Sequence, residues 1–216
     1  MGVQHRITDD ILADYAAGNL AEAFNLVVAS HVSLCPESRN RLGELECVGG
    51  AILESGEVAP MSEGSLEATL ALIAGGAPAE PIMTQPPMQG SVLPAPLREY
   101  IGGDVDQVRW RSVGMGVKQA ILQTSPEASA RLLYIPAGCE MPDHGHRGME
   151  MTLVLQGAFL DGEERFARGD VEIAGEELEH MPVADVGEDC ICLAATDAPL
   201  KFTGVLPRLF QPFLKI

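Results

Sequence analysis

The sequence predicts two domains: a small all-α domain of four helices, followed by an all-β barrel or sandwich. Residues 1–76 carry apolar side chains at intervals of three and four, which is typical of amphipathic helices. Residues 98–216 contain short β-type runs separated by Gly, Pro and Asp. Between them, residues 77–97 are rich in proline, which removes backbone donors and favours an extended chain. We therefore expect a linker at residues 77–97.

The composition narrows the class of protein. The 216 residues are 46% hydrophobic and 21% charged, which is enough apolar material for buried cores. A formal charge of −17 argues against direct nucleic-acid binding, because phosphate contacts need clustered Lys and Arg, and it suits a basic protein partner better. The five cysteines, an odd number at irregular spacing, favour thiolate or metal chemistry over a disulfide scaffold.

The sequence also bears on localisation. The longest uncharged stretches are too short, or too rich in Pro and Gly, to span a bilayer. The first ten residues lack the apolar core of a signal peptide. We therefore expect a cytoplasmic protein with reduced cysteines and no membrane contact.

Residues that cap or break helices divide the helical half. Thr8 is a plausible N-cap for the first helix, and Gly18 ends it. Pro36 interrupts the second helix, and Gly49 with Gly50 closes the third. Four short helices with few large residues make a thin core, which a structural metal or a partner often supplements. The expected helices run from Thr8 to Gly18, from Leu20 to Cys35, over Arg39–Val48, and from Ser62 or Ser65 to Gly75.

The second half contains six short β-type runs, with no long helical period between them. Many short strands at regular spacing favour a β-sandwich or small barrel. The expected strands are Val105–Val108, Val117–Leu122, Arg131–Tyr134, Met151–Leu155, Val171–Ile173 and Cys190–Ala194.

The helical half contains a candidate metal site. His31 and Cys35 are four residues apart, so on a helix an imidazole and a thiolate can point at one ion. His5, just before the first helix, could add a ligand from elsewhere. The alternative is that these are half-buried helix residues with no metal.

The β half contains a more specific pattern of candidate metal ligands. His144 and His146 alternate to the same face of a strand, Glu150 follows on the next stretch, and His180 comes from another strand. Three imidazoles and one carboxylate then converge on one ion. Such a set accepts zinc, iron, manganese or nickel, and the order of affinities alone does not choose among them. Surface histidines on an ordinary β domain are the alternative.

This second pattern resembles the cupin family. The spacing Gly138-x5-His144-x-His146-x3-Glu150-x6-Gly157 reproduces the first cupin motif, and Gly169-x10-His180 keeps the spacing of the second. The resemblance implies a cupin-like domain over residues 98–216 with His144, His146, Glu150 and His180 as ligands of Zn²⁺ or another divalent transition metal.

The helical pattern resembles the zinc-binding anti-sigma domain. This chain has the pattern His31-x3-Cys35-x2-Ser38, preceded by an N-terminal histidine. In the zinc-binding anti-sigma domain the last position of this pattern is normally a second cysteine. The resemblance implies Zn²⁺ bound by His5, His31 and Cys35. A neutral serine is a poor zinc ligand, so either water or another group completes a three-residue site, or the fourth ligand has been removed. Cys47 is a possible substitute, although its place inside the third helix argues against it.

Over nearly its entire length the chain resembles the ChrR family of anti-sigma factors, in which a helical zinc domain is joined to a cupin-like domain. The resemblance implies that residues 1–76 bind a group IV, extracytoplasmic-function (ECF) sigma factor and prevent its association with RNA polymerase. It also implies that the metal-bound cupin domain is needed for release in response to singlet oxygen or related oxidative stress. The chain would then be a regulator of transcription, not an enzyme, and would make no direct contact with nucleic acid.

Two further features have open interpretations. Leu66, Leu70 and Ile73 form an apolar stripe that could dock on the sigma factor or pack on the other helices. Cys190 and Cys192 lie on one face of a predicted strand, where oxidation or metal ligation is conceivable and a role as small core residues is the simpler interpretation.

A second function from another class is a metal-dependent cupin enzyme such as a dioxygenase, with a helical part that only dimerises it. An open metal position could bind oxygen or a chelating substrate. This alternative leaves His5, His31 and Cys35 unexplained, and the sequence shows no obvious paired acid and base beyond the metal ligands. We therefore prefer the regulator.

Overall fold

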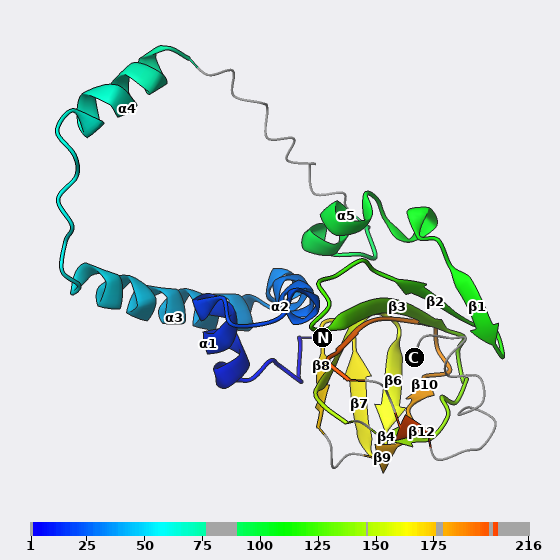
Figure 1. The fold of residues 1–216 in the computed structure, drawn as a ribbon. Coiled ribbons are helices and arrows are strands. Elements are labelled where there is room, and N and C mark those ends of the chain that lie inside the picture. The colour runs from blue at the N-terminus through cyan, green and yellow to red at the C-terminus, as the bar shows by residue number, and fades with distance from the viewer. Residues whose placement is uncertain (1, 77–89, 146, 176–178, 199–200, 203–216) are drawn as a thin grey trace.

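The computed structural model describes residues 2–76, 90–145, 147–175, 179–198 and 201–202. In this part of the chain the helices precede the strands, as the sequence predicted (Figure 1). The helices are α1 (Asp9–Ala17), α2 (Glu22–Leu34), α3 (Pro36–Glu54), α4 (Ser65–Ala74) and α5 (Ala95–Ile101), and a 3-10 turn spans Val105–Gln107.

The predicted helix boundaries at Gly18 and Pro36 are confirmed. Gly18 follows α1 in the left-handed conformation, with a φ of 73° that glycine adopts without strain. Pro36 is the first residue of α3, where its missing N–H is not needed. The third helix is longer than predicted, because Gly49 and Gly50 continue α3 to Glu54 instead of ending it.

The region around the predicted linker differs in part from expectation. Residues 77–89 of the predicted linker lie outside the described residues, and α5 begins within its last three positions. The predicted strand at Val105–Val108 is wrong. The backbone carbonyl of Asp104 accepts the Gln107 N–H and closes a 3-10 turn there. The Asp104 carboxylate also accepts the N–H groups of Val92 and Leu93, which ties this turn to the start of the β domain.

The β domain is a sandwich of antiparallel strands. Its large sheet has the strand order β1-β2-β3-β11-β5-β8, and two three-stranded sheets have the orders β10-β6-β7 and β12-β4-β9. The strands are β1 (Arg111–Gly114), β2 (Val117–Ile121), β3 (Ser129–Ile135), β4 (His144–Gly145), β5 (Glu150–Gln156), β6 (Ala158–Asp161), β7 (Glu164–Ala167), β8 (Val171–Ala174), β9 (Glu179–His180), β10 (Val183–Ala184), β11 (Cys190–Thr196) and β12 (Lys201–Phe202).

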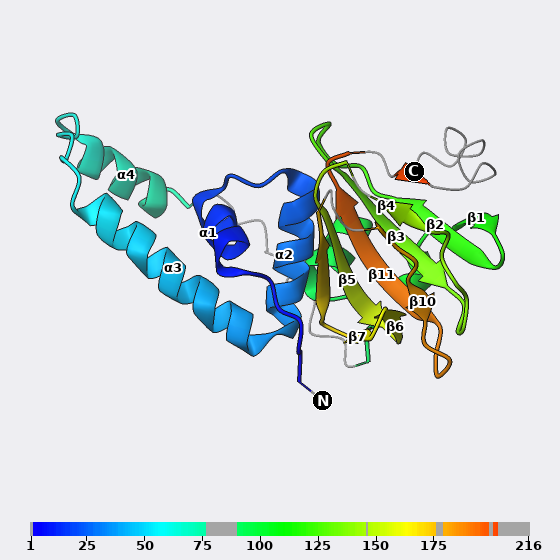
Figure 2. The same ribbon diagram turned by 90° about the horizontal axis from the view of Figure 1, so that it is seen from below.

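Helix α2 packs on the outer face of the large sheet (Figures 1 and 2). Phe24 and Val28 of α2 belong to the same buried cluster as Leu132, Leu153 and Leu193 of the sheet. Removing this shared apolar surface from water stabilises both parts together. The thin helical core predicted from the sequence is therefore supplemented by the β domain itself.

A second buried cluster fills the interior of the sandwich. Val117, Val154 and Cys192 come from the large sheet, and Phe159 and Phe166 come from β6 and β7. The two phenylalanine rings stack with their centroids 5.0 Å apart. Strand residues thus alternate between the α2 side and the interior, as period-two side-chain direction requires.

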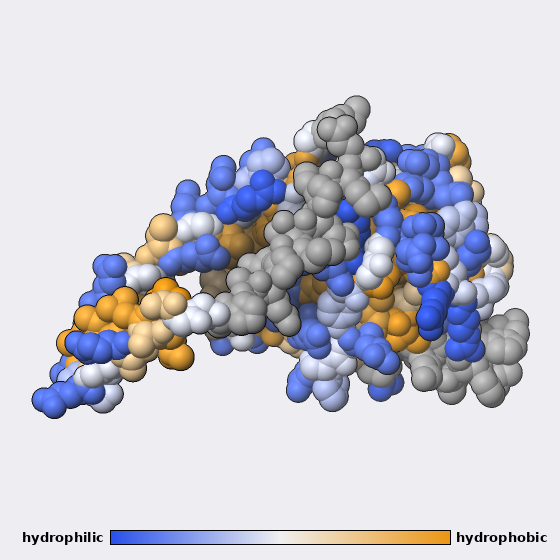
Figure 3. All heavy atoms as spheres, turned by 90° about the horizontal axis from the view of Figure 1, so that it is seen from above, coloured by the Kyte–Doolittle hydropathy of each residue, from blue (hydrophilic) through white to orange (hydrophobic). Residues whose placement is uncertain are grey.

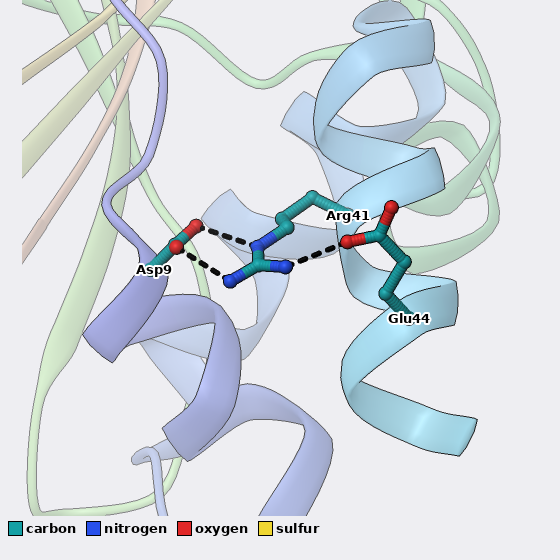
Figure 4. Close-up of polar contacts among 3 residues, drawn as sticks. All are labelled: Asp9, Arg41 and Glu44. Atoms are coloured by element: carbon teal, nitrogen blue, oxygen red, sulfur yellow. Dashed lines mark hydrogen bonds and ion pairs between the residues drawn. The ribbon is translucent and has the colours of Figure 1, made fainter. Parts of the chain in front are cut away.

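Polar contacts set the position of α1 against α3 (Figure 4). Arg41 of α3 donates two hydrogen bonds to the Asp9 carboxylate of α1, from Nε to Oδ1 at 3.0 Å and from Nη2 to Oδ2 at 2.8 Å. Its Nη1 donates to Glu44 Oε2 at 2.6 Å. The Arg41 hydrogen bonds lower the pKa of Asp9. These side chains are exposed to water, so the paired geometry fixes the approach of the two helices more than it stabilises them.

Figure 1 shows helix α4 apart from the rest of the described chain. None of its residues is buried. Within the described residues, no helix has both the length and the apolar character needed to cross a membrane.

Candidate functional site

A group of potential metal ligands lies inside the β domain. The Nδ1 atom of His180, on β9, is 3.0 Å from Asp161 Oδ2, at the end of β6, and 3.7 Å from Glu172 Oε1, on β8. Their ligand atoms all lie within 4.8 Å of one another, and no other three His, Cys, Asp or Glu residues do so in the described ranges. His180 and Glu172 are buried, so the β sandwich has placed a charged cluster in a low-dielectric interior.

The structure places part of the predicted cupin ligand set in this interior. His144 pairs directly with His180 in the β4–β9 ladder, although its side chain, like the whole of His146, lies outside the described residues. Glu150 begins β5, and its carboxylate accepts a hydrogen bond from Thr152 Oγ1 at 3.1 Å. Thr152 pairs with Glu172 across β5 and β8, so Glu150 and Glu172 face the same side of the sheet.

Opposite charges in this group compensate one another. Burial raises the pKa of Glu172, and the neighbouring His180 opposes that shift. Burial also raises the pKa of Glu150. For His180, burial alone would lower the pKa, but Glu172 and Asp161 together raise it to about 9. A buried imidazole surrounded by carboxylates is an environment that favours positive charge. These nitrogen and oxygen donors fit a divalent transition metal, including zinc.

Asp161 and Glu172 were missed by the sequence reasoning. Glu172 had a usable signal, because it is an acidic residue in the middle of the apolar run Val171–Ile173. A carboxylate in a buried strand requires a compensating partner. Asp161 precedes the turn at Gly162, where an aspartate is ordinary, so nothing in the sequence distinguished it.

The cysteine pair lies beside this cluster. Cys190 and Cys192 share one face of β11, as predicted, with their Sγ atoms 3.5 Å apart and both side chains buried. The adjacent Cys190 thiol and burial raise the pKa of the Cys192 thiol, so the thiol form is favoured over the nucleophilic thiolate. This environment supports the interpretation of the two residues as small core residues.

The helical candidate site has a different chemistry. His31 is fully buried, with its Nδ1 atom 2.9 Å from the Gly169 carbonyl oxygen and its Nε2 atom 2.8 Å from Ser38 Oγ. A carbonyl only accepts hydrogen bonds, so Nδ1 donates to Gly169. Burial lowers the pKa of His31, which favours the neutral ring. In that form Nε2 accepts the hydrogen bond of the Ser38 hydroxyl.

Of the other predicted helical ligands, Cys35 lies near His31, because both contact Ser38, whereas His5 lies against β7. Cys35 is buried, and its sulfur accepts the Ser38 N–H at 3.5 Å, which caps α3. The His5 ring lies 4.3 Å from the Phe166 ring of β7, measured between centroids. The ligand atoms of His5, His31 and Cys35 do not all lie within 4.8 Å of one another. Cys47 is exposed on α3. In this arrangement the three donor atoms do not form one group of candidate metal ligands.

The stripe predicted on the fourth helix is open to water. Leu66, Leu70 and Ile73 of α4 are 65%, 55% and 71% exposed, and Ile52 and Leu53 at the end of α3 are exposed as well. Figure 3 shows a hydrophobic surface at this end of the molecule. Contiguous exposed apolar surface of this kind marks a site of protein interaction. We call Leu66, Leu70 and Ile73 the α4 surface.

The fold joins a set of helices to a cupin-like β sandwich, and comparison with known proteins agrees. Residues 98–199 match the family model of the ChrR cupin-like domain. The chain is 54% identical to the anti-sigma-E factor ChrR of Cereibacter sphaeroides over 220 residues, which cover 100% of both proteins. It also resembles a crystal structure of Rhodobacter sphaeroides SigE in complex with the anti-sigma factor ChrR. That likeness has 52% identity and a TM-score of 0.79, and it covers 90% of this chain and 99% of the other. The chain belongs to the ChrR family of anti-sigma factors.

Proposed function

We propose that this chain binds and inhibits a group IV (ECF) sigma factor in the cytoplasm and prevents its association with RNA polymerase. Full-length similarity to an anti-sigma factor is the observation that carries this function. The charge of −17 adds support, because the basic surfaces with which a sigma factor contacts DNA attract an acidic partner. The chain itself makes no direct contact with nucleic acid.

The α4 surface is the part of the molecule we assign to the sigma factor. An amphipathic helix that leaves its apolar side chains unburied is suited to a groove on a partner. Leu70 and Ile73 would lose their contact with water on binding, and each fully buried side chain of this type contributes about 1.5–3 kcal/mol. Release of the inhibitor would expose this surface again.

The cupin domain supplies the metal-dependent half of the function. We assign zinc or another divalent transition metal to His144, His146, Glu150 and His180, and we propose that it is needed for release in response to singlet oxygen. The interior position of Glu150 and the carboxylates around His180 support this assignment. The family is regulatory, so we expect no dioxygenase or other enzymatic activity.

The test is co-purification of the tagged full-length chain from its own cells, followed by transcription assays with the sigma factor that is recovered. The expected result is a one-to-one complex and loss of transcription from the promoter of that sigma factor. A chain that retains no sigma factor and leaves this transcription unchanged would contradict the proposal.

Variants of the α4 surface sharpen this test. Leu70→Asp and Ile73→Asp together should weaken binding by more than about 30-fold, because the loss of even one hot-spot side chain costs about 2 kcal/mol. Val186→Asp is the matched control, since Val186 is an exposed apolar residue of the β domain. Equal loss of binding in the control and in the α4 variant would remove α4 from the interface.

A further inference from the structure

We propose that the helical domain of this chain holds its inhibitory fold without a metal ion, because the Ser38 hydroxyl occupies the ring nitrogen of His31 that zinc would need. The chain then carries one metal ion, in the cupin domain. The sequence left two alternatives open, a three-residue zinc site completed by water and the loss of a ligand. The contacts of His31 favour the second.

The hydrogen bonds of His31 determine which ring nitrogen carries the proton. Nδ1 donates to the Gly169 carbonyl, so in the neutral ring Nε2 has the lone pair. That lone pair accepts the Ser38 hydroxyl hydrogen at 2.8 Å. Without a metal, a buried cysteine at position 38 would be a thiol, whose S–H is only a weak donor, whereas a serine hydroxyl is a strong one. Serine at position 38 therefore gives His31 Nε2 a stronger hydrogen bond when no metal is present.

The distance between these atoms is that of a hydrogen bond. Zinc binds nitrogen and oxygen at about 2.0–2.2 Å, so two ligand atoms of a tetrahedral site lie about 3.3 Å apart. His31 Nε2 and Ser38 Oγ are 2.8 Å apart, which is a normal length for a hydrogen bond between these atoms. Both side chains are buried, so water does not compete for this contact.

Hydrogen bonds already join the elements that a zinc ion would join. The His31–Ser38 contact connects α2 to the first turn of α3, and the Cys35 sulfur caps the same turn. The N-terminal segment is held separately. Asp170 Oδ1 accepts the backbone N–H groups of Gln4 and His5 at 2.6 and 3.0 Å.

These links converge on the turn between β7 and β8. Gly169 accepts from His31, and the neighbouring Asp170 binds the N-terminal segment. The Val171 N–H also donates to the His5 carbonyl at 2.9 Å. The cupin-like domain thereby anchors both α2 and the chain preceding α1. A metal ion would be redundant in this role.

The experiment counts metal ions on the full-length chain after it is loaded with excess Zn²⁺ and desalted. Elemental analysis should give about one zinc per chain for the wild type, for Cys35→Ser and for Ser38→Ala. His180→Ala should lower the count toward zero. Two zinc ions in the wild type, or loss of an ion in Cys35→Ser, would overturn the proposal. Cys35→Ser removes the thiolate but keeps a side chain that can cap α3.

A stability measurement separates the hydrogen bond from metal binding. Ser38→Ala leaves His31 Nε2 buried without a donor, so its Tm should fall by about 2–4 °C at unchanged zinc content. Ser33→Ala is the control, because the Ser33 hydroxyl donates only to the Ser30 carbonyl in its own helix. An unchanged Tm in Ser38→Ala would contradict the structural role of the hydroxyl. The inference concerns the domain to which we assign sigma-factor inhibition, but the zinc count and the Tm need no sigma factor, so they can fail independently of the proposed function.

Discussion

Two buried histidines, His31 and His180, have opposite surroundings. A carbonyl and a hydroxyl oxygen face the ring of His31, and two carboxylates face Nδ1 of His180. Burial lowers the pKa of His31, whereas the carboxylates outweigh burial and raise that of His180 to about 9. Neutral partners favour a fixed structural link, and anionic partners favour a cation. Motif spacing predicted metal binding at both places, and the surrounding oxygen atoms distinguish them.

The largest expected difference between the two histidines is in metal affinity. His180→Ala should weaken zinc binding more than about 100-fold, because even the outer partners of metal ligands contribute 10–100-fold. His31→Ala should leave the affinity of the cupin site unchanged and reduce stability instead. Titration of both full-length variants with Zn²⁺ and a competing chelator measures this. Equal losses of zinc affinity would break the distinction between the two sites.

The carboxylate beside His180 should have the next largest effect. Asp161→Asn keeps the side-chain size but removes the charge that orients Nδ1, so zinc affinity should fall by about 10–100-fold. Asp185→Asn provides the control, because Asp185 is paired with Arg165 near the surface. The same chelator competition reads out both variants. An unchanged affinity in Asp161→Asn would show that Asp161 does not position the metal ligand.

The turn at Gly169, whose carbonyl accepts the hydrogen bond of His31, should lose stability when a single methyl group is added. Gly169 has a φ of +93°, and a Cβ there would lie 2.7 Å from Val3 Cγ2 in the N-terminal segment. Gly169→Ala should therefore lower the free energy of unfolding by about 1–3 kcal/mol. Gly162→Ala is matched, because Gly162 also has a positive φ, of +57°, but open space around it. Urea denaturation of both variants tests this, and equal losses would mean that the contact with the N-terminal segment adds nothing.

The smallest effect is the pH dependence that His31 contributes. Its pKa in the folded chain is below the ordinary value of 6.5, so below pH 6.5 the unfolded chain binds a proton that the folded chain does not. Above pH 6.5, the neutral His31 ring therefore makes its whole contribution to the free energy of unfolding. As the pH drops from 6.5 toward the pKa of the folded chain, this contribution falls by at most about 1.4 kcal/mol per pH unit.

Urea denaturation at pH 7.5 and pH 5.5 in a His180→Ala background isolates this contribution. His180 is removed because its raised pKa has the opposite sign of effect on stability. Adding His31→Gln should reduce the pH dependence. The same slope with and without His31 would contradict a buried, neutral ring.

Much of the architecture followed from the sequence because local signals determined it. Gly18 and Pro36 mark helix boundaries by backbone geometry alone, and short β-type runs separated by Gly, Pro and Asp predicted the strands around Leu132 and Leu193. The packing of α2 on the sheet was not predictable in this way. It depends on contacts between residues that are more than one hundred positions apart in the chain.

The two candidate metal sites were likewise predictable only where the signal was local in the sequence. Motif spacing predicted His180 and Glu150 as metal ligands, because a metal site requires its donors at defined strand positions. The sequence also singled out Ser38 as a departure from the zinc pattern. It did not show that the Ser38 hydroxyl meets His31, or that the Gly169 carbonyl lies on the opposite side of the ring, since a hydrogen-bond partner from a distant turn has no sequence signature.

We infer that the helices inhibit the sigma factor without a metal and that the cupin metal is needed only for release. The direct measurement is to form the complex of this chain with its sigma factor, remove metal with a chelator, and follow the bound fraction before and during illumination with a singlet-oxygen-generating dye. We expect the metal-free complex to stay intact both before and during illumination, whereas the metal-loaded complex should dissociate on illumination. Dissociation on chelation alone would contradict this inference.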